Sequence, residues 1–183
     1  MFLTRLFTRT SPTEPAEALY GTVVARAREP SFYRNLRVPD TVEGRFEMIC
    51  LHVYLILRRL KGGEGMAGGN GALGQALFDA MFADMDRSLR EMGVGDLGVG
   101  RRVKTMAEAF YGRIRAYDDG LAGGEPVLAR ALARNVLASA DDAPGAVVLA
   151  RYALDSMRAL EGLPDIDLAR GTAVFAPVPG GAA

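Results

Sequence analysis

The chain has 183 residues, with 22 Lys and Arg, 22 Asp and Glu, and a single cysteine. This length suits one domain, which would bury roughly two thirds of its unfolded surface. The balanced charge excludes nucleic-acid binding by overall attraction, so we expect no DNA partner. Cys50 has no second cysteine with which to form an internal disulfide, and no secretory signal is present. We therefore expect a domain in a reducing, cytoplasmic compartment.

Residues 1–13 are expected to form a separate N-terminal segment. The run MFLTRLFTRT places four apolar side chains on one side of a short helix, with Arg5 and Arg9 beside them. It is far shorter than the roughly 20 apolar residues needed to cross a bilayer. Two interpretations remain open: a frayed terminus, or a peripheral contact with the inner face of the cytoplasmic membrane.

Residues 14–161 are expected to form a helical domain. Apolar residues at helical spacing predict helices over 16–28, 41–60, 127–138 and 145–160. The helix 41–60 is apolar on nearly every side and is therefore the predicted central buried helix, with Asp40 or Thr41 as its cap. We expect an irregular connector over 31–41 and a mobile glycine-rich linker over 61–74.

The stretch 78–121 is predicted to form a helical hairpin. Phe78, Met81, Phe82, Met85, Leu89 and Met92 recur at spacings of three and four, and a second apolar stripe follows from Val99 to Leu121. Gly93 suits the left-handed position that ends the first helix, and Asp96 is the expected cap of the second. Both stripes are interpreted as core-facing.

Residues 162–183 contain three prolines and are expected to form a tail that lies extended on the surface or is disordered. No segment has strand patterning strong enough to predict a sheet. The predicted fold is a single all-α domain of about six to seven helices around a central buried helix, with an extended C-terminal tail.

No motif of the chain supports catalysis, a cofactor or a metal. The match of residues 93–98 to GxGxxG follows a helix instead of a strand, and Asp96 would repel a phosphate. His52 is the only histidine and shares its helix with Cys50, so they make neither a metal cluster nor a catalytic pair. We expect a non-enzyme in which His52 lies in the core or faces a partner.

Polar side chains around the bend of the hairpin, and along its second helix, suit hydrogen bonding to a partner protein. An internal network that holds the hairpin together is the alternative interpretation. The candidate partner-binding residues are Arg90, Glu91, Asp96, Arg101, Arg102, Lys104, Tyr111 and Arg113.

Two runs of the sequence resemble the ubiquinol-cytochrome c chaperone family. They are LFDAMFADMDRSLREMGVGDLGVGRRVKTMAEAFYGRIRAY (77–117) and PSFYRNLRVPDTVEGRFEMICLHVYLILRRL (30–60), and the resemblance extends over about residues 20–121. It implies a non-catalytic assembly chaperone that binds cytochrome b during biogenesis of ubiquinol-cytochrome c reductase. The chain looks like a bacterial relative without a mitochondrial import segment. The small partner protein and the ribosome contact of mitochondrial members are open expectations.

Two other classes of function remain as alternatives. An adaptor for RNA or the ribosome would use the basic face of residues 101–115 and would lose affinity steeply as salt rises. An unrecognised small-molecule enzyme would show a deep pocket with polar side chains. A chaperone would instead show an exposed apolar groove.

Overall fold

The computed structural model describes residues 12–62, 69–139 and 143–180, and over these ranges the chain forms helices and no strand. The helices are α1 (Thr13–Ala27), α2 (Pro30–Arg34), α3 (Val42–Gly62), α4 (Gly69–Glu91), α5 (Asp96–Gly123), α6 (Glu125–Asn135), α7 (Pro144–Glu161) and α8 (Asp165–Ala169). No helix within these ranges is both long and apolar enough to cross a bilayer. The prediction of an all-α domain is confirmed. Residues 1–11 of the predicted N-terminal segment lie outside the described residues.

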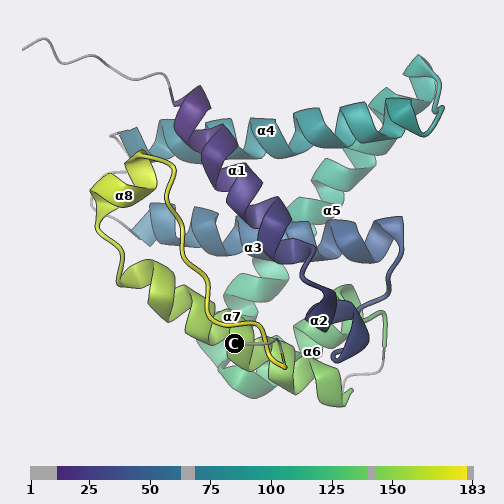
Figure 1. Cartoon of the computed structure of the whole chain (residues 1–183). Coiled ribbons are helices and arrows are strands. Elements are labelled where there is room, and N and C mark those ends of the chain that lie inside the picture. The colour runs from purple at the N-terminus through teal and green to yellow at the C-terminus, as the bar shows by residue number, and fades with distance from the viewer. Residues whose placement is uncertain (1–11, 63–68, 140–142, 181–183) are drawn as a thin grey trace, which may run out of the picture.

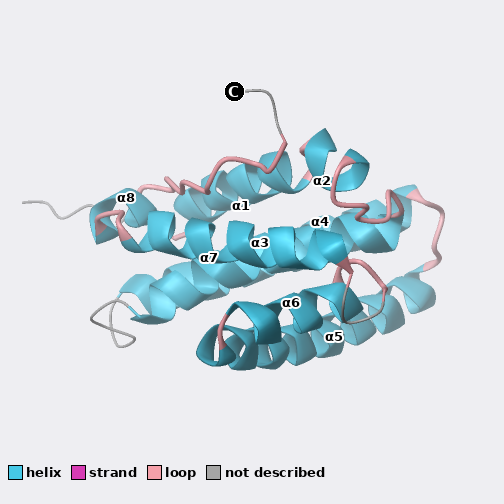
Figure 2. Ribbon diagram, turned by 90° about the horizontal axis from the view of Figure 1, so that it is seen from below, coloured by secondary structure: helices cyan, strands magenta, loops and turns pink. Residues whose placement is uncertain are grey.

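Helix α3 lies at the centre of the fold. In Figure 1, α1 crosses in front of α3 and α4, while α5 passes behind them. Figure 2 shows α5 and α6 on one side of α3 and α7, with α1 and α2 on the other side. The most extensive helix pairings are those of α5 with α6 and of α6 with α7. The close packing of α5 on α6 requires the glycine at position 120, because a Cβ there would lie only 2.9 Å from the Cα of Leu128.

The central position of α3 follows from its composition. Met48, Cys50, Leu51 and Ile56 point in different directions around the helix, and each is fully buried because α1, α4, α5 and α7 all pack against it. The helix begins where expected: the Thr41 hydroxyl oxygen accepts a hydrogen bond from the Gly44 amide at 3.1 Å. Thr41 therefore confirms one of the two predicted caps.

Helices α4 and α5 form the predicted hairpin. Gly93 has φ of 81°, the left-handed conformation expected at the end of α4. Helix α4 begins nine residues before Phe78, so the part of the predicted linker from residue 69 onward is helical. The reason is that Leu73 and Leu77 extend the apolar stripe and are buried. Residues 63–68 of the predicted linker lie outside the described residues.

Two segments are packed more tightly than the sequence predicts. The connector 31–41 was expected to be irregular, but its first residues belong to α2 and place the Phe32 ring in the core. The predicted tail 162–183 contains the helix α8, so the prediction of an extended chain is wrong there. After α8 the tail runs extended, as expected, but its surface placement is wrong for Phe175 and Ala176, which are buried. The Phe175 ring lies edge-on to the His52 ring, with 4.9 Å between the ring centroids, because a large apolar side chain gains free energy by covering the core.

Candidate functional site

The predicted partner-binding residues divide into three groups in the structure. Arg90 and Asp96 form an ion pair across the bend, and the Arg90 Nε also donates to Asp86 Oδ2 at 2.6 Å. Arg101, Arg102 and Lys104 are exposed on the first turns of α5, while Glu91 is exposed at the end of α4. Tyr111 and Arg113 lie further along α5, roughly 25 Å from Asp96 at 1.5 Å per residue. The bend and the far part of α5 are therefore separate places.

Arg113 belongs to an internal pair. Its Nε donates to Glu47 Oε2 at 2.8 Å, its Nη2 also bonds to Glu47 Oε1, and its Nη1 donates to the Ala109 carbonyl at 3.1 Å. The hydrogen bonds to Glu47 raise the pKa of Arg113. The two side chains are only 22% and 11% exposed, so the pair ties α5 to α3. Partner binding by Arg113 stays a prediction, because only a small part of its side chain is exposed to a partner.

The prediction that Asp96 caps α5 is wrong. Gly95 occupies the cap position without a side-chain hydrogen bond, and Asp96 is the first residue of the helix. Its carboxylate is 87% exposed and is held by Arg90 instead. The acidic charge still lies near the positive end of the helix dipole, which favours it there.

An open apolar groove lies beside the bend. It has a volume of about 340 Å³ and is lined by residues from the first turns of α3 and the last turns of α4, together with Met106 of α5. We call it the methionine groove. Its apolar lining consists of Val42, Phe46, Ile49, Met85, Leu89, Met92 and Met106.

Methionine gives this groove an adaptable surface. The unbranched, polarisable side chain adjusts to partners of different shape. Met92 is 51% exposed, Val42 is 57% exposed, and Met106 is half-buried, so the groove is open to solvent. Leu97, beside the bend, is 94% exposed and adds to the apolar surface there.

Sequence reasoning placed the groove's side chains in the core. Met85, Met92 and Met106 fall on the apolar stripes of the two hairpin helices. Burial is confirmed for Met85, whereas Met106 is half-buried and Met92 is 51% exposed, because a stripe predicts burial without naming what covers it. The available signal was the density of methionine, since Met81, Met85 and Met92 all lie on one stripe.

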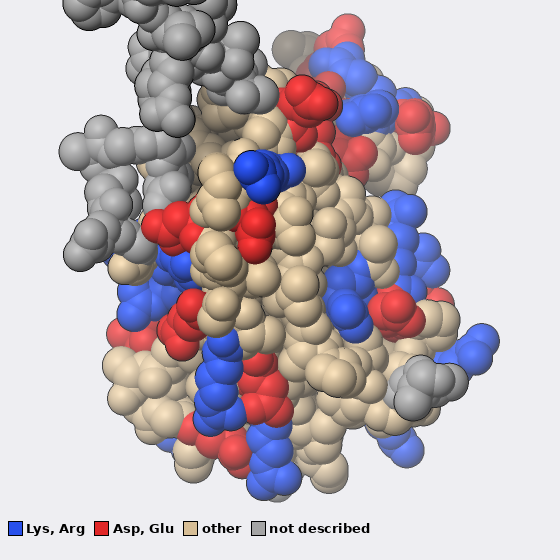
Figure 3. Space-filling view, turned by 60° about the vertical axis from the view of Figure 1, so that its left-hand side comes forward, with Lys and Arg blue, Asp and Glu red and all other residues tan. Residues whose placement is uncertain are grey.

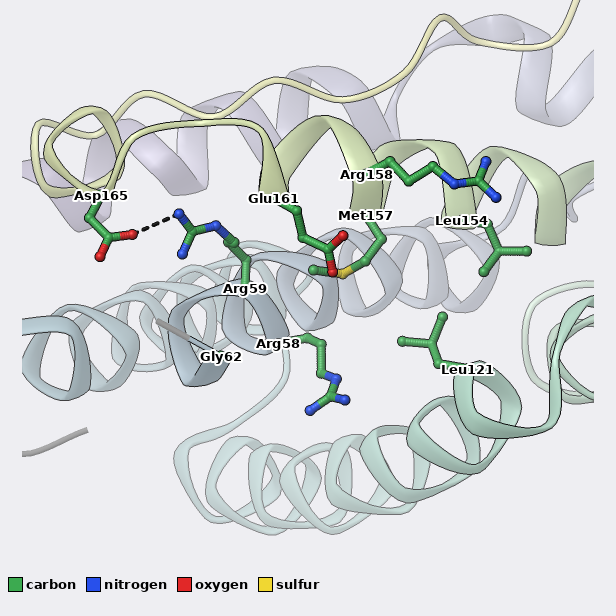
Figure 4. A pocket seen from close by; sticks show the side chains of 9 residues that line it. All are labelled: Arg58, Arg59, Gly62, Leu121, Leu154, Met157, Arg158, Glu161 and Asp165. Atoms are coloured by element: carbon green, nitrogen blue, oxygen red, sulfur yellow. Dashed lines mark hydrogen bonds and ion pairs between the residues drawn. The ribbon is translucent and has the colours of Figure 1, made fainter. Parts of the chain in front are cut away.

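A larger hollow of about 640 Å³ lies at the ends of α3 and α7, as Figure 4 shows. Its most buried arginine, Arg59, donates to the carbonyls of Leu160 and Leu163 and to Asp165. Arg58 pairs with Asp118 at 3.6 Å, and Arg158 pairs with Asp155 at 2.5 Å. These guanidinium groups already bind acceptors within the protein. We therefore interpret the hollow as a place where the helix ends are held together.

His52 and Cys50 lie in the core. His52 is fully buried, and burial lowers its pKa to about 4, so the imidazole is neutral. Burial raises the pKa of the Cys50 thiol. In the described part of the chain, no three His, Cys, Asp or Glu residues lie close enough together to hold a metal ion. His52 takes the core position that was one of its two predicted environments.

The surface charge is mixed on the face that Figure 3 shows. Lys and Arg alternate there with Asp and Glu around uncharged surface, so this face carries no broad basic patch. On α5, Lys104 lies 4.0 Å from Glu108, and Arg113 is paired with Glu47. Two cations of the predicted basic face 101–115 therefore have acidic neighbours.

The described residues form a helical domain that leaves a methionine-lined groove open and encloses His52 and Cys50 in its core. Residues 34–175 match the family model described as ubiquinol-cytochrome C chaperone. The chain belongs to the ubiquinol-cytochrome c chaperone family, which confirms the resemblance found in its sequence.

Individual relatives agree with the family model. The chain is 30% identical over 162 residues to ubiquinol-cytochrome-c reductase complex assembly factor 1 of Xenopus laevis, covering 87% of this chain and 80% of the frog protein. It is 29% identical over 150 residues to protein CBP3, mitochondrial, of Saccharomyces cerevisiae, covering 80% of this chain but only 44% of the yeast protein. The crystal structure of the Cbp3 homolog from Brucella abortus has a TM-score of 0.81 and 39% identity, covering 92% of this chain and 93% of that one.

Proposed function

We propose that this protein is a non-catalytic assembly chaperone that binds cytochrome b, or an assembly intermediate containing it, during biogenesis of ubiquinol-cytochrome c reductase. The observation that carries the proposal is the open methionine groove beside the hairpin bend. The names of the relatives support the assembly role, since the frog protein is named as an assembly factor of this reductase complex.

The groove has the physical properties that such a role requires. A newly made subunit exposes apolar surface that its finished complex later buries, and this surface drives aggregation while it is free. A groove lined by Met85, Met92 and Met106 covers such a surface by apolar burial without demanding one fixed shape. Because that contact depends on area and little on direction, the client can later be released to its final partners.

The exposed charges near the bend complete the proposed client surface. Arg90, Glu91 and Asp96 are exposed at the bend that carries the exposed Leu97, and Arg101 and Arg102 follow on α5. Polar residues beside an apolar centre are typical of non-obligate interfaces. We place the protein in the cytoplasm, with a peripheral membrane contact through its N-terminal segment as part of the same proposal. A small partner protein or the ribosome would bind outside the groove.

The test is a matched pair of surface substitutions in a strain that depends on this chaperone. Met92→Glu puts a charge into the groove, and Ile166→Glu puts the same charge on α8, where Ile166 is 55% exposed against 51% for Met92. We expect only Met92→Glu to reduce cytochrome b recovered with the chaperone, together with the assembled reductase on native gels. Normal assembly with Met92→Glu would contradict the proposal, provided that the variant is folded and present at the normal level.

The RNA or ribosome adaptor has less support, because Lys104 and Arg113 on the predicted basic face already lie beside acids. Such an adaptor would bind RNA with an affinity that falls steeply between low and physiological salt. We expect the purified protein to show no binding of this kind.

A further inference from the structure

The walls of the methionine groove carry opposite charges. Arg28 at the end of α1 and Arg45 on α3 line one side, and Asp84 and Glu91 on α4 line the other. A partner lying along the groove would therefore have a cationic wall on one flank and an anionic wall on the other.

One charge on each wall is available to a partner. Arg45 pairs with Asp40 at 2.8 Å, and Asp84 accepts a hydrogen bond from the Tyr20 hydroxyl at 2.9 Å. Neither Arg28 nor Glu91 forms an ion pair or a side-chain hydrogen bond with any residue that the structure describes, and both are exposed. These two side chains can pair with charges on a partner without breaking an internal contact.

The shape of the groove favours a helix as its occupant. Val42, Arg45, Phe46 and Ile49 have the spacing of one helix face, and the α4 residues from 84 to 92 that line the opposite wall have the same spacing. Two such ridged walls accept the ridge of a third helix over about two to three turns. A β-strand would have no strand edge to pair with in the described ranges.

We propose that the methionine groove binds an amphipathic helix of the client protein, with its apolar stripe on the methionines, acidic side chains facing Arg28 and Arg45, and basic side chains facing Asp84 and Glu91. This inference rests on the proposed chaperone function and specifies the segment that the groove selects. A given helix satisfies both walls in one direction only, because reversing the helix exchanges its two flanks. The partner is thus selected by the charges on both flanks of its apolar stripe.

Three designed peptides of about 15 residues, a length at which an isolated helix begins to be stable, test this selection. All share one leucine stripe. The mixed peptide has Glu on one flank and Lys on the other, and the two controls have only Glu or only Lys on both flanks. Fluorescence anisotropy of labelled peptides should give the mixed peptide an affinity about three- to tenfold higher than either control, the range expected for exposed ion pairs. Methyl NMR of the methionines should show shifts at Met92 and Met106 and none at Met157 on α7.

Charge reversal on each wall gives the decisive comparison. Glu91→Lys should make the all-Glu peptide the preferred one, and Arg28→Glu should make the all-Lys peptide the preferred one. Arg130→Glu, on the exposed face of α6, is the matched control and should leave the ranking unchanged. Higher salt should reduce the differences among the peptides while the shared apolar binding persists.

The inference is overturned if the mixed peptide shows no advantage, or if the two reversals leave the preference unchanged. A dimer of the chain that peptides convert to monomers would also overturn it, since the groove's occupant would then be a second copy. Failure of the inference alone differs from failure of the proposed function: in the first case Met92→Glu still lowers reductase assembly, and in the second it does not.

Discussion

The Nε2 atom of His52 accepts a hydrogen bond of 2.8 Å from the hydroxyl of Tyr152, which lies 100 residues further along the chain. The direction follows from the other ring nitrogen, because Nδ1 lies 2.7 Å from the Met48 carbonyl, an oxygen that can only accept. The imidazole thus joins α3 to α7 as a neutral group. Phe32 and Phe175 pack their rings around it.

This arrangement predicts a loss of stability in mild acid. The folded-state pKa of His52, about 4, lies below the ordinary value of 6.5, so between these pH values the unfolded chain binds a proton that the folded chain does not. Stability is therefore complete above pH 6.5 and falls as the pH drops toward 4, by roughly 3 kcal/mol from this group. Urea unfolding of the wild type and of His52→Gln across this range should show the extra slope only in the wild type. Equal slopes would contradict the prediction.

Arg113 should act mainly on stability. Arg113→Ala leaves the Glu47 carboxylate poorly solvated and unpaired, which we expect to cost about 2 kcal/mol, between the values for exposed and fully buried pairs. Arg115→Ala is the matched control, because Arg115 is exposed two residues further along α5 and should change stability by less than about 0.5 kcal/mol. Thermal unfolding distinguishes the two variants. A small effect for Arg113→Ala, with impaired client binding, would favour the partner-binding role.

Thr41 and Asp96 offer a comparison of two helix starts. Thr41→Ala removes the hydrogen bond to the Gly44 amide and should cost about 1 kcal/mol. Asp96→Ala removes no cap and only an exposed ion pair, so its melting temperature should fall less than that of Thr41→Ala. The reverse order would indicate that Asp96 does support α5 in solution.

Two glycines of α5 should respond to alanine with opposite signs. Gly120→Ala places a Cβ 2.9 Å from the Cα of Leu128 and should cost about 1 to 3 kcal/mol by separating α5 from α6. Gly112→Ala meets no atom within 4 Å on the exposed face of the same helix, so it should stabilise the fold by up to about 1 kcal/mol. Chemical unfolding midpoints measure both. Similar effects from the two changes would mean that the α5–α6 contact is looser than described.

The double change Arg101→Glu and Arg102→Glu tests the bend as a partner surface. Both arginines are exposed on the first turns of α5, where acidic residues suit the helix dipole better. We expect a melting temperature that is unchanged or slightly higher, together with less assembled reductase. Arg130→Glu on α6 is the control for added negative charge. An unfolded double variant would place the arginines in an internal network, and normal assembly would remove them from the client site.

The sequence by itself determined the long helices of this protein. The 3.6-residue spacing of apolar side chains located the long helices, and Gly93 marked the bend, because such local features depend on neighbours within a few residues. The same local signals identified α3 as the buried centre, since a helix that is apolar on every side must be covered on every side.

The tertiary structure decided which apolar faces are covered. Periodicity assigns Met85, Met92 and Met106 to a face, but whether another helix lies on that face depends on how α3, α4 and α5 cross, and here they leave a groove. The partner of Arg113 is Glu47, 66 residues away, and the cover of His52 is Phe175 from the tail. Contacts between residues far apart in sequence arise only when the chain closes on itself, so no local pattern of residues contains them.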